Sequence, residues 1–481
     1  MSPPKQPQRL FQLSIKSCLN VINYACYVIE KSCSEGEFDE CEKKVYSLKC
    51  HLMTVLPCRL FDVLCSERTC CQYRGDPRIQ LHVLTHPNMT VFRKCDLDNS
   101  IPQPFWIETL SKFSRLVVLD LKFICTDEIL NVVGLNCLLL EELNIVSKVD
   151  IYKSLFNASV LIRNVSDAGL YSIAPLKLLR ILAMDPPRNE RANRVGRCVS
   201  QAGIIMLINE LPRLEELRIE SCDIGSTLIG TVMEIGPLSL QKVNCHYASA
   251  DGIRKLINIC PCLRELSITH LSEHNKDAIL EQISTSELRL NRLNLSFFSY
   301  SESMQKLLLF KGCYLTHFSL WEIENSLTLD AILSIGLCCT NLNSLYLMSQ
   351  SKSLEVPRYF QRPNNIFNNL QHLTIGNDTF SIEQILTFFL NCTSNLQTLV
   401  LKYQTKVNID NTLSSLLRKG CFKNIDNLWL DCTLEVSKNV VKEIIQSCDK
   451  LQMLTVDLNE DTSDFHRYIS DNNLDLKLGS Y

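Results

Sequence analysis

The stretch LNRLNL at residues 290–295 decides the fold, because the spacing of its apolar residues returns throughout the chain. A leucine is followed by apolar residues three and five positions later, and polar residues separate them here. In a strand, the residues at +3 and +5 point to one side and their neighbours to the other. Each such phrase therefore predicts a short strand that turns two apolar side chains toward a core.

The phrase occurs fourteen times, and its first instance is read as Phe92, Cys95 and Leu97. Successive phrases start 23 to 29 residues apart, except for two steps of 39 and 35 residues. A period in this range is typical of leucine-rich repeats, which alternate a strand with a return segment. The phrases begin at Phe92, Leu116, Leu140, Leu179, Leu214, Leu240, Leu263, Leu290, Leu315, Leu342, Leu370, Leu396, Ile425 and Leu451.

The return segments are expected to be helices, since Asp251–Ile259 and Ser381–Leu390 carry apolar residues at helical spacing. Strand plus helix predicts an α/β fold, a leucine-rich-repeat solenoid curved into a horseshoe. We expect this solenoid over residues 88–460. An N-terminal helical segment, 1–87, precedes it, and a C-terminal tail, 461–481, follows it.

Composition bears on the partners and the compartment. The 481 residues carry a net charge of −3, which gives no basic field for nucleic acid or an anionic membrane. The chain starts MSPPKQPQR, too polar for a signal peptide, so its 24 cysteines are expected to be reduced in the cytoplasm or nucleus. The apolar stretch 10–29 includes Gln12, Lys16 and Asn20, so no membrane span is expected.

Motifs for chemistry are missing from the sequence. It contains no P-loop, no nucleophile elbow, no HExxH and no CxxC. His270 and His274 are spaced by four residues, but the sequence positions no third metal ligand beside them. We therefore expect no enzyme, no catalytic residue, no cofactor and no metal.

Cysteines and helix openings add a resemblance to a known repeat subclass. The openings CTDEIL at 125–130 and VSDAGL at 165–170 place a Thr-Asp or Ser-Asp pair where it would cap a helix. With the cysteines, they resemble the cysteine-containing leucine-rich repeats. That resemblance implies a non-catalytic substrate receptor of a cullin-RING ubiquitin ligase. The cysteines that precede or follow a phrase are Cys137, Cys339, Cys392, Cys448, Cys125, Cys222 and Cys432.

The segment 1–87 is expected to be helical. The stretch Arg9–Ile29 places one apolar face along a helix, and the stretch Tyr46–Leu64 is broken at Pro57, which would start a new helix. The apolar face of the first stretch consists of Phe11, Ile15, Cys18, Ile22, Cys26 and Ile29.

Two short boxes in this segment resemble those of von Hippel-Lindau-box receptors with leucine-rich repeats, such as the Zyg-eleven family. The spacing of Leu10, Ser14 and Cys18 is similar to an elongin-binding box, although Ser14 stands where cysteine is typical and Cys18 where a larger aliphatic residue is typical. The resemblance implies that elongin C, with its elongin B partner, and a cullin bind here. The residues that resemble the cullin-contacting box are Leu56, Pro57, Leu60 and Leu64.

Two alternatives stay open for this segment. An F-box also opens with Leu-Pro and ends at a motif like FRKCDL, residues 92–97, which would imply a Skp-family adaptor. The cysteine-tryptophan centre of an F-box is missing, with CCQYRG at 70–75 in its place. The third possibility is a helical cap that covers the first repeat of a protein-binding scaffold.

Outward strand residues are candidates for binding a protein substrate. The +4 positions of six phrases give Asn294, Ser319, Tyr346, Thr374, Val400 and Trp429; the +6 positions give Ser296, Trp321, Met348, Gly376, Lys402 and Asp431. Tryptophan and tyrosine are enriched at interface hot spots, so we predict a substrate patch of Trp321, Tyr346, Met348, Lys402 and Trp429. The alternative is that these rings only pack against adjacent strands.

The longer step after Leu179 contains a loop, residues 185–198, in which arginines recur every three residues. We expect it to protrude. It either binds an acidic or phosphorylated segment, because arginine grips such groups bidentately, or is a solvated mobile insertion.

Overall fold

The computed structural model describes most of the chain, and every structural statement below concerns this part of it. The described residues are 7–32, 38–68, 73, 75–93, 100–146, 165–185, 199–219, 224–229, 236–270, 275–323, 327–349, 366–377, 382–393, 395–402, 406–431, 433–456, 465, 467–469 and 477–479.

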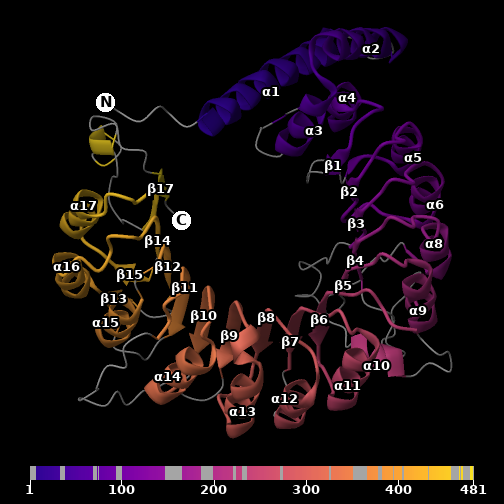
Figure 1. Cartoon of the computed structure of the whole chain (residues 1–481). Helices are drawn as coiled ribbons and strands as arrows, with labels where there is room; N and C mark the ends of the chain where they lie inside the picture. Colours follow the sequence, from indigo (N-terminus) through magenta and orange to yellow (C-terminus); the bar gives the residue numbers. More distant parts are fainter. Residues whose placement is uncertain are drawn as a thin grey trace, which may run out of the picture.

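One 15-stranded parallel sheet runs through the molecule in chain order and lines the inside of a horseshoe (Figure 1). Its strands are β1 Val91–Arg93, β2 Val118–Asp120, β3 Glu142–Asn144, β4 Ile181–Met184, β5 Glu216–Ile219, β6 Lys242–His246, β7 Glu265–Thr269, β8 Arg292–Ser296, β9 His317–Ile323, β10 Ser344–Ser349, β11 His372–Asn377, β12 Thr398–Lys402, β14 Asn427–Leu430, β16 Met453–Thr455 and β17 Lys477–Gly479. Two short strands, β13 Val407–Asn408 and β15 Leu434–Glu435, pair separately.

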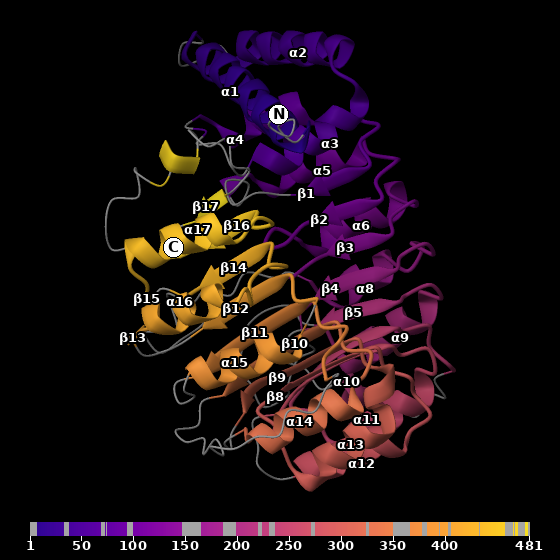
Figure 2. The ribbon, with the colours of Figure 1, turned by 60° about the vertical axis from the view of Figure 1, so that its left-hand side comes forward.

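Helices cover the outside of the sheet, so that each repeat contributes one strand and one return segment (Figures 1 and 2). These helices are α5 Gln103–Ser111, α6 Asp127–Asn136, α8 Asp167–Ser172, α9 Gln201–Glu210, α10 Ile224–Ile229, α11 Ala250–Ile259, α12 Lys276–Thr285, α13 Glu302–Lys311, α14 Leu329–Cys338, α15 Ile382–Cys392, α16 Asp410–Arg418 and α17 Lys438–Ser447. The two return helices predicted at 251–259 and 381–390 are α11 and α15.

The repeated phrase does what its spacing predicts. In β8, Leu293 and Leu295 are fully buried and face the core between the sheet and the helices. Their partners in β7 are Leu266 and Ile268, also buried, so equivalent apolar residues stack from strand to strand. The predicted leucine-rich-repeat solenoid is confirmed.

Helix caps connect neighbouring repeats. The Thr126 hydroxyl accepts a hydrogen bond from the Ile129 amide, and the Ser166 hydroxyl accepts one from Ala168. The carboxylate of Asp127, the first residue of α6, in turn accepts bonds from the Ser166 amide at 2.7 Å and the Ser166 hydroxyl at 2.6 Å. The predicted Thr/Ser-Asp caps are thus confirmed, and each aspartate also clamps the cap of the next helix.

The clamp recurs along the stack. Asp167 of α8 accepts from the Ser200 amide and hydroxyl at 2.7 and 2.6 Å, and Asp410 of α16 accepts from the Ser437 amide at 2.8 Å. Hydrogen bonds to ionised groups are stronger than neutral ones, so these clamps add repeat-to-repeat stability to the shared apolar core.

The two ends of the sheet correct the sequence analysis. The first phrase was placed three residues too late: Phe92 pairs with Leu119, so Phe92 is the +3 residue and buried Met89 opens the phrase. Residues 94–99, including Cys95 and Leu97, lie outside the described part. At the other end, β17 pairs with β16 and adds a strand within the segment that was expected to be a tail.

In the described residues before the sheet there are four α-helices: α1 Pro7–Ser32, α2 Phe38–Val55, α3 Cys58–Glu67 and α4 Pro77–Leu84. They share a small apolar core that includes Leu19 of α1, Leu64 of α3 and Val83 of α4. As predicted, Pro57 precedes a new helix, since it is the N-cap residue of α3. Helix α1 reaches back across the open side of the horseshoe, toward the C-terminal repeats (Figure 1).

Candidate protein-binding surfaces

Helix α1 has two apolar faces. Its inner face is buried in the core of the N-terminal helices, through Ile15, Leu19, Ile22 and Cys26. The opposite face also carries large apolar side chains, and these are exposed. The exposed fractions are 58% for Leu13, 67% for Val21, 70% for Tyr24 and 44% for Val28. We call these four residues the outer stripe of α1.

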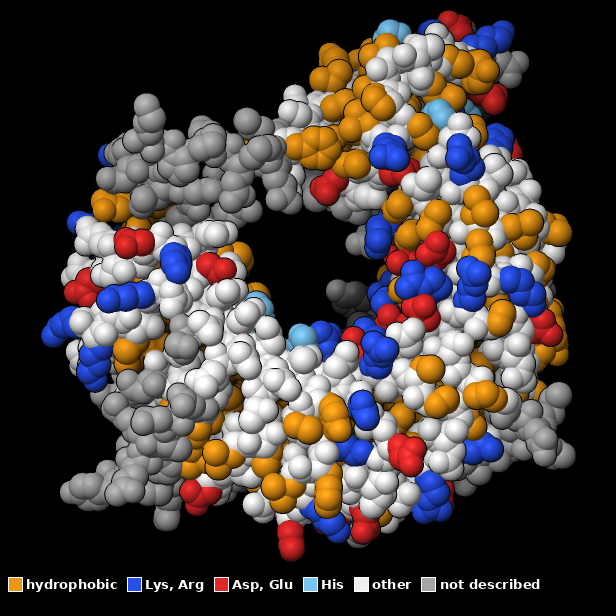
Figure 3. All heavy atoms as spheres, in the orientation of Figure 1, with side chains coloured by type: hydrophobic (Ala, Val, Ile, Leu, Met, Phe, Trp, Pro, Cys, Tyr) orange, Lys and Arg blue, Asp and Glu red, His pale blue; other side chains and the backbone are white. Residues whose placement is uncertain are grey.

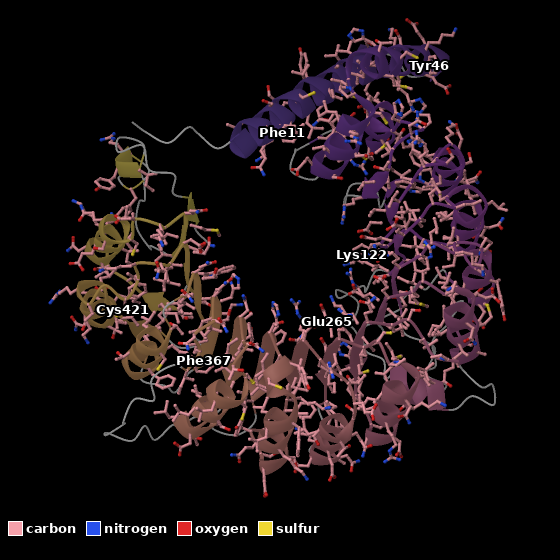
Figure 4. All side chains as sticks on the ribbon, in the orientation of Figure 1. Phe11, Tyr46, Lys122, Glu265, Phe367 and Cys421 are labelled. Atoms are coloured by element: carbon pink, nitrogen blue, oxygen red, sulfur yellow. The ribbon has the colours of Figure 1, made fainter. Side chains whose placement is uncertain are left out.

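The predicted adaptor-binding residues fall on different faces of α1. Ser14 is exposed beside the outer stripe. Cys18 is half-buried and packs against the core of the N-terminal helices, where burial raises the pKa of its thiol. Leu10 belongs to α1, but its side chain lies outside the described part. Phe11, predicted on the same apolar face as Ile15 and Cys18, is 50% exposed near the free end of α1 (Figure 4).

The predicted cullin-contacting residues are also divided. Pro57 is exposed at the start of α3, and Leu56 and Leu60 are half-buried against the core of the N-terminal helices. Leu64 is fully buried in that core. In this structure Leu64 therefore holds α3 against its neighbours, and Pro57 is the most accessible of the four residues.

On the inner face of the horseshoe, the strand register brings most of the two predicted columns together. Ser319 pairs with Tyr346, Tyr346 with Thr374, and Val400 with Trp429. In the second column Ser296 pairs with Trp321. A register shift between β9 and β10 interrupts this second column between Trp321 and Met348.

Aromatic residues of this face contact side chains on neighbouring strands. The rings of Trp321 and Tyr346 meet edge to face with centroids 6.2 Å apart. The Lys402 ammonium lies over the Trp429 ring, 5.8 Å from its centroid. Trp321 is 48% exposed and Trp429 37%, so each ring packs against a neighbour and still offers a face to a partner.

Gly376 makes room for Met348. A Cβ atom at this glycine would lie 2.0 Å from the Met348 sulfur, so any larger residue would displace that side chain. The half-buried thioether of Met348 therefore packs over the glycine between the two aromatic contacts. Methionine adapts its shape to a partner, which suits a binding surface.

A charged column on strands β5 to β8 was not predicted. The Lys242 ammonium lies 3.0 Å from the Glu216 carboxylate and 3.7 Å from that of Glu265, and the Arg292 guanidinium lies 3.9 Å from Glu265. Figure 4 shows Glu265 on the side facing the centre of the ring, and Figure 3 shows charged side chains gathered on this part of the inner face. The signal in the sequence is the +2 position of consecutive phrases, which alternates in charge.

Electrostatics of this column are tuned by its neighbours. Burial by itself raises the pKa of Glu216, but hydrogen bonds from Arg218 and Lys242 outweigh it and lower the pKa overall. Burial and the Arg292 charge lower the pKa of His317 on the adjoining strand. The first half of the inner face is therefore ionic at neutral pH, and the second half is aromatic.

The described cysteines are free thiols. Burial raises the pKa of Cys137, Cys260 and Cys339 to about 12, which keeps them protonated and unreactive at neutral pH. In the part of the chain that the structure describes, no group of three or more His, Cys, Asp or Glu residues could hold a metal ion. His270 is buried, and its predicted companion His274 lies outside this part.

Two further expectations concern segments and spans. Residues 186–198, which hold the arginines of the predicted loop, lie outside the described part. Of the described helices, none combines the length and the apolar character needed to cross a membrane.

The sequence and the structure were compared with those of known proteins. No known protein family and no curated protein matches the sequence. Among solved structures, the chain is similar to that of a Rad7 and Elc1 complex in yeast, with 13% identity, 83% of this chain and 94% of that chain covered, and a TM-score of 0.41. It is also similar to the leucine-rich repeat-containing protein LegL7 from Legionella pneumophila, with 14% identity, coverage of 78% and 96%, and a TM-score of 0.32.

Proposed function

We propose that this protein is the substrate-recognition subunit of a cullin-RING ubiquitin ligase. Helix α1 docks elongin C, the start of α3 contacts a cullin, and the inner face of the horseshoe holds a protein substrate. The chain itself supplies binding, and catalysis belongs to its partner subunits.

The observation that carries the proposal is the outer stripe of α1. Four large apolar side chains on one face of a helix cost solvation free energy when they stay in water, and such patches mark protein interaction sites. The stripe is continuous with exposed Ser14 of the elongin-like box, and the box residue Leu10 lies one helical turn before Ser14. A second helix or groove packed against this stripe would remove the apolar surface from water.

Support for the cullin contact comes from the first turn of α3. Pro57 is exposed and Leu60 half-buried, so both can touch a partner that approaches this end of the helix. Leu64 acts indirectly, because its burial against α1 fixes the angle between the two helices. A cullin at this position would meet the adaptor side of the module and leave the inner face of the repeats open for substrate.

Support for the substrate site comes from the contacts of the second half of the inner face. Trp321 with Tyr346, and Trp429 with Lys402, leave large partly exposed rings that are already held in place by neighbours. Rings that are ordered before binding lose little conformational entropy on binding. Met348 lies beside them as an adaptable apolar contact.

Co-purification of the full chain with recombinant elongin BC and, separately, with a Skp-family adaptor tests the proposal. Wild type is expected to retain elongin BC. Leu10→Ala and the double variant Val21→Asp/Tyr24→Asp are expected to lose it, because truncation of an anchoring leucine costs about 2 to 5 kcal/mol and a buried unpaired carboxylate costs several more.

The matched control is Tyr46→Asp, which makes the same chemical change at an exposed aromatic of α2, 62% exposed and away from the outer stripe. This variant should bind like wild type. Retention of the Skp-family adaptor alone would assign the F-box alternative, and retention of neither adaptor would reduce residues 1–87 to a cap on a protein-binding scaffold.

A further inference from the structure

A recess lies where the N-terminal helices meet the first repeat. It is a small cavity of about 20 Å³, and its walls come from α2, from α4 with the residues after it, and from α5 with the residues after it. The polar side chains that line it are Lys49, His82, Thr85, Thr109 and Lys112. Neither the adaptor surface nor the inner face of the horseshoe includes these residues.

Cations outnumber anions around this recess. The Lys112 ammonium pairs with the Glu108 carboxylate at 2.7 Å. The Lys49 ammonium donates only to the Thr85 hydroxyl, at 3.3 Å, and the described residues give it no carboxylate partner. No hydrogen bond to the His82 ring is found among those residues either. Two ammonium groups and an imidazole therefore share a single carboxylate.

The electrostatics of the walls agree with this geometry. Burial and the neighbouring Lys112 charge lower the pKa of Lys49 to about 8, although Cys50 and Glu108 oppose the shift. Burial, Lys49 and Lys112 lower the pKa of His82, against the pull of Glu108. A partly buried cation without a counterion destabilises the folded state, and an anion placed between these groups would remove that cost.

We propose that this recess binds a phosphate group, as inorganic phosphate or as a phosphate ester. The Lys49 and Lys112 ammonium groups and the His82 imidazolium would donate to its oxygens, with the hydroxyl of Thr109 in the wall as a further donor. A doubly charged tetrahedral oxyanion fits better than a carboxylate, because the donors approach from three separate helical segments and carry more than one positive charge.

Binding at this position has a structural consequence. Lys49 belongs to the N-terminal helices, whereas Thr109 and Lys112 belong to the first repeat. A bound phosphate would therefore bridge the two parts and stiffen their joint. This inference is independent of the adaptor and of the substrate proposed above.

The first experiment measures the melting temperature of the full chain against sodium sulfate, with sodium chloride at equal ionic strength as reference. Sulfate also stabilises proteins without binding them, because it is excluded from their surface. That general effect grows steadily with concentration and is equal in all variants. Binding in the recess saturates instead, and should fall about tenfold or more in affinity in Lys49→Gln and in Lys112→Gln, as one charged contact is removed.

The matched control is Lys43→Gln, the same change at an exposed lysine of α2 outside the recess. It should keep the wild-type response. Lys112 is half-exposed, so Lys112→Gln tests the proposal even if Lys49→Gln folds poorly. An unsaturable response, or a saturable one that both recess variants retain, would overturn the proposal.

Two further arms sharpen the assignment. Sulfate keeps its double charge as the pH falls from about 8 to about 6, while Lys49 and His82 gain protons, so its affinity should rise. In Lys49→Gln the rise should be smaller, because only His82 still gains a proton. Cys50, His86, Glu108 and Lys112 also lie near these groups, and the variant removes only the Lys49 contribution. Inorganic phosphate and an N-acetyl-phosphoserine amide then separate the sources: a site for phosphorylated partners binds both, and a site for the free ion binds the first alone.

Discussion

Helix α1 and the repeat helix α17 bury one face in the same way and differ on the other. In α17, Val440, Val441, Ile444 and Ile445 are buried, and the exposed side is polar, with Asn439, Lys442, Glu443 and Gln446. In α1 the exposed side is the apolar outer stripe. The repeat helix α17 thus leaves no large apolar side chain in water once its inner face is covered, whereas α1 leaves the outer stripe in water. The difference separates a face that builds the fold from an apolar face that the chain leaves exposed.

The contrast between the two faces of α1 requires that the N-terminal helices are stabilised by their buried inner faces. Leu64→Ala deletes a fully buried side chain from the core they share. We expect a loss of about 2 to 5 kcal/mol in the unfolding free energy of these helices, from the lost burial and the cavity left behind. Hydrogen exchange of the backbone amides across residues 7–84 measures the unfolding free energy of these helices separately from that of the repeats.

Val21→Ala on the outer stripe is the matched control, with an expected change within about 0.5 kcal/mol. Equal losses in the two variants would mean that the outer stripe is part of the core, and that α1 has no free face to offer an adaptor.

The next prediction concerns the repeat helices, whose ends are tied by the aspartate clamps. Ser166→Ala removes the cap of α8 and one bond to Asp127. We expect a loss of about 1 to 3 kcal/mol in urea unfolding, since a cap contributes about 1 kcal/mol and a bond to a charged group somewhat more.

Ser172→Ala in the same helix is the control. The Ser172 hydroxyl donates to the Ala168 carbonyl one turn earlier, so it neither caps the helix nor joins two repeats. It should change the unfolding free energy by less than half as much. A similar loss in both variants would show that the clamp adds nothing beyond helix propensity.

The smallest stability effect is expected on the inner face. Trp429→Ala removes a partly exposed ring and its contact with Lys402, which should lower the unfolding free energy by about 1 kcal/mol or less. Binding of the substrate, measured by surface plasmon resonance once it is captured, should weaken by about 2 kcal/mol. Met453→Ala, 39% exposed on the strand paired with β14, is the control. If Trp429→Ala unfolds the chain instead, the ring is core.

The sequence predicted the repeats well because burial of the +3 and +5 residues is periodic. It failed where that pattern is incomplete. The first phrase has Lys94 at +5 instead of an apolar residue. The apolar Cys95 and Leu97 fit the spacing from Phe92, so the start of the phrase was predicted three residues too late. The last phrase has only Leu478, between Asp475 and Ser480, and β17 is identified by its pairing with β16.

The candidate sites were harder to predict, because amphipathic periodicity does not say which apolar face is covered. The box pattern grouped Leu56, Pro57, Leu60 and Leu64, but only tertiary packing divides exposed Pro57 from buried Leu64. The recess at Lys49 joins residues 49, 82 and 112, which no local motif connects. The first predicted cross-strand column is confirmed along its whole length, because a parallel register follows directly from the repeat length. The second column is interrupted by the register shift between β9 and β10, which the repeat length does not predict.

The aspartate clamps, finally, bear on how the molecule responds to force. Each clamp and each strand pair joins a repeat only to its neighbours, so a pull on the two ends of the stack loads every interface equally. A terminal repeat, which is held by one neighbour instead of two, should unfold first. The stack should therefore unfold sequentially, one repeat after another. With 23 to 29 residues per regular repeat and about 3.5 Å per extended residue, each release would lengthen the chain by about 80 to 100 Å. In the proposed role, with a ligase bound at one end and a large substrate at the other, the chain would lengthen in these steps before either partner dissociated.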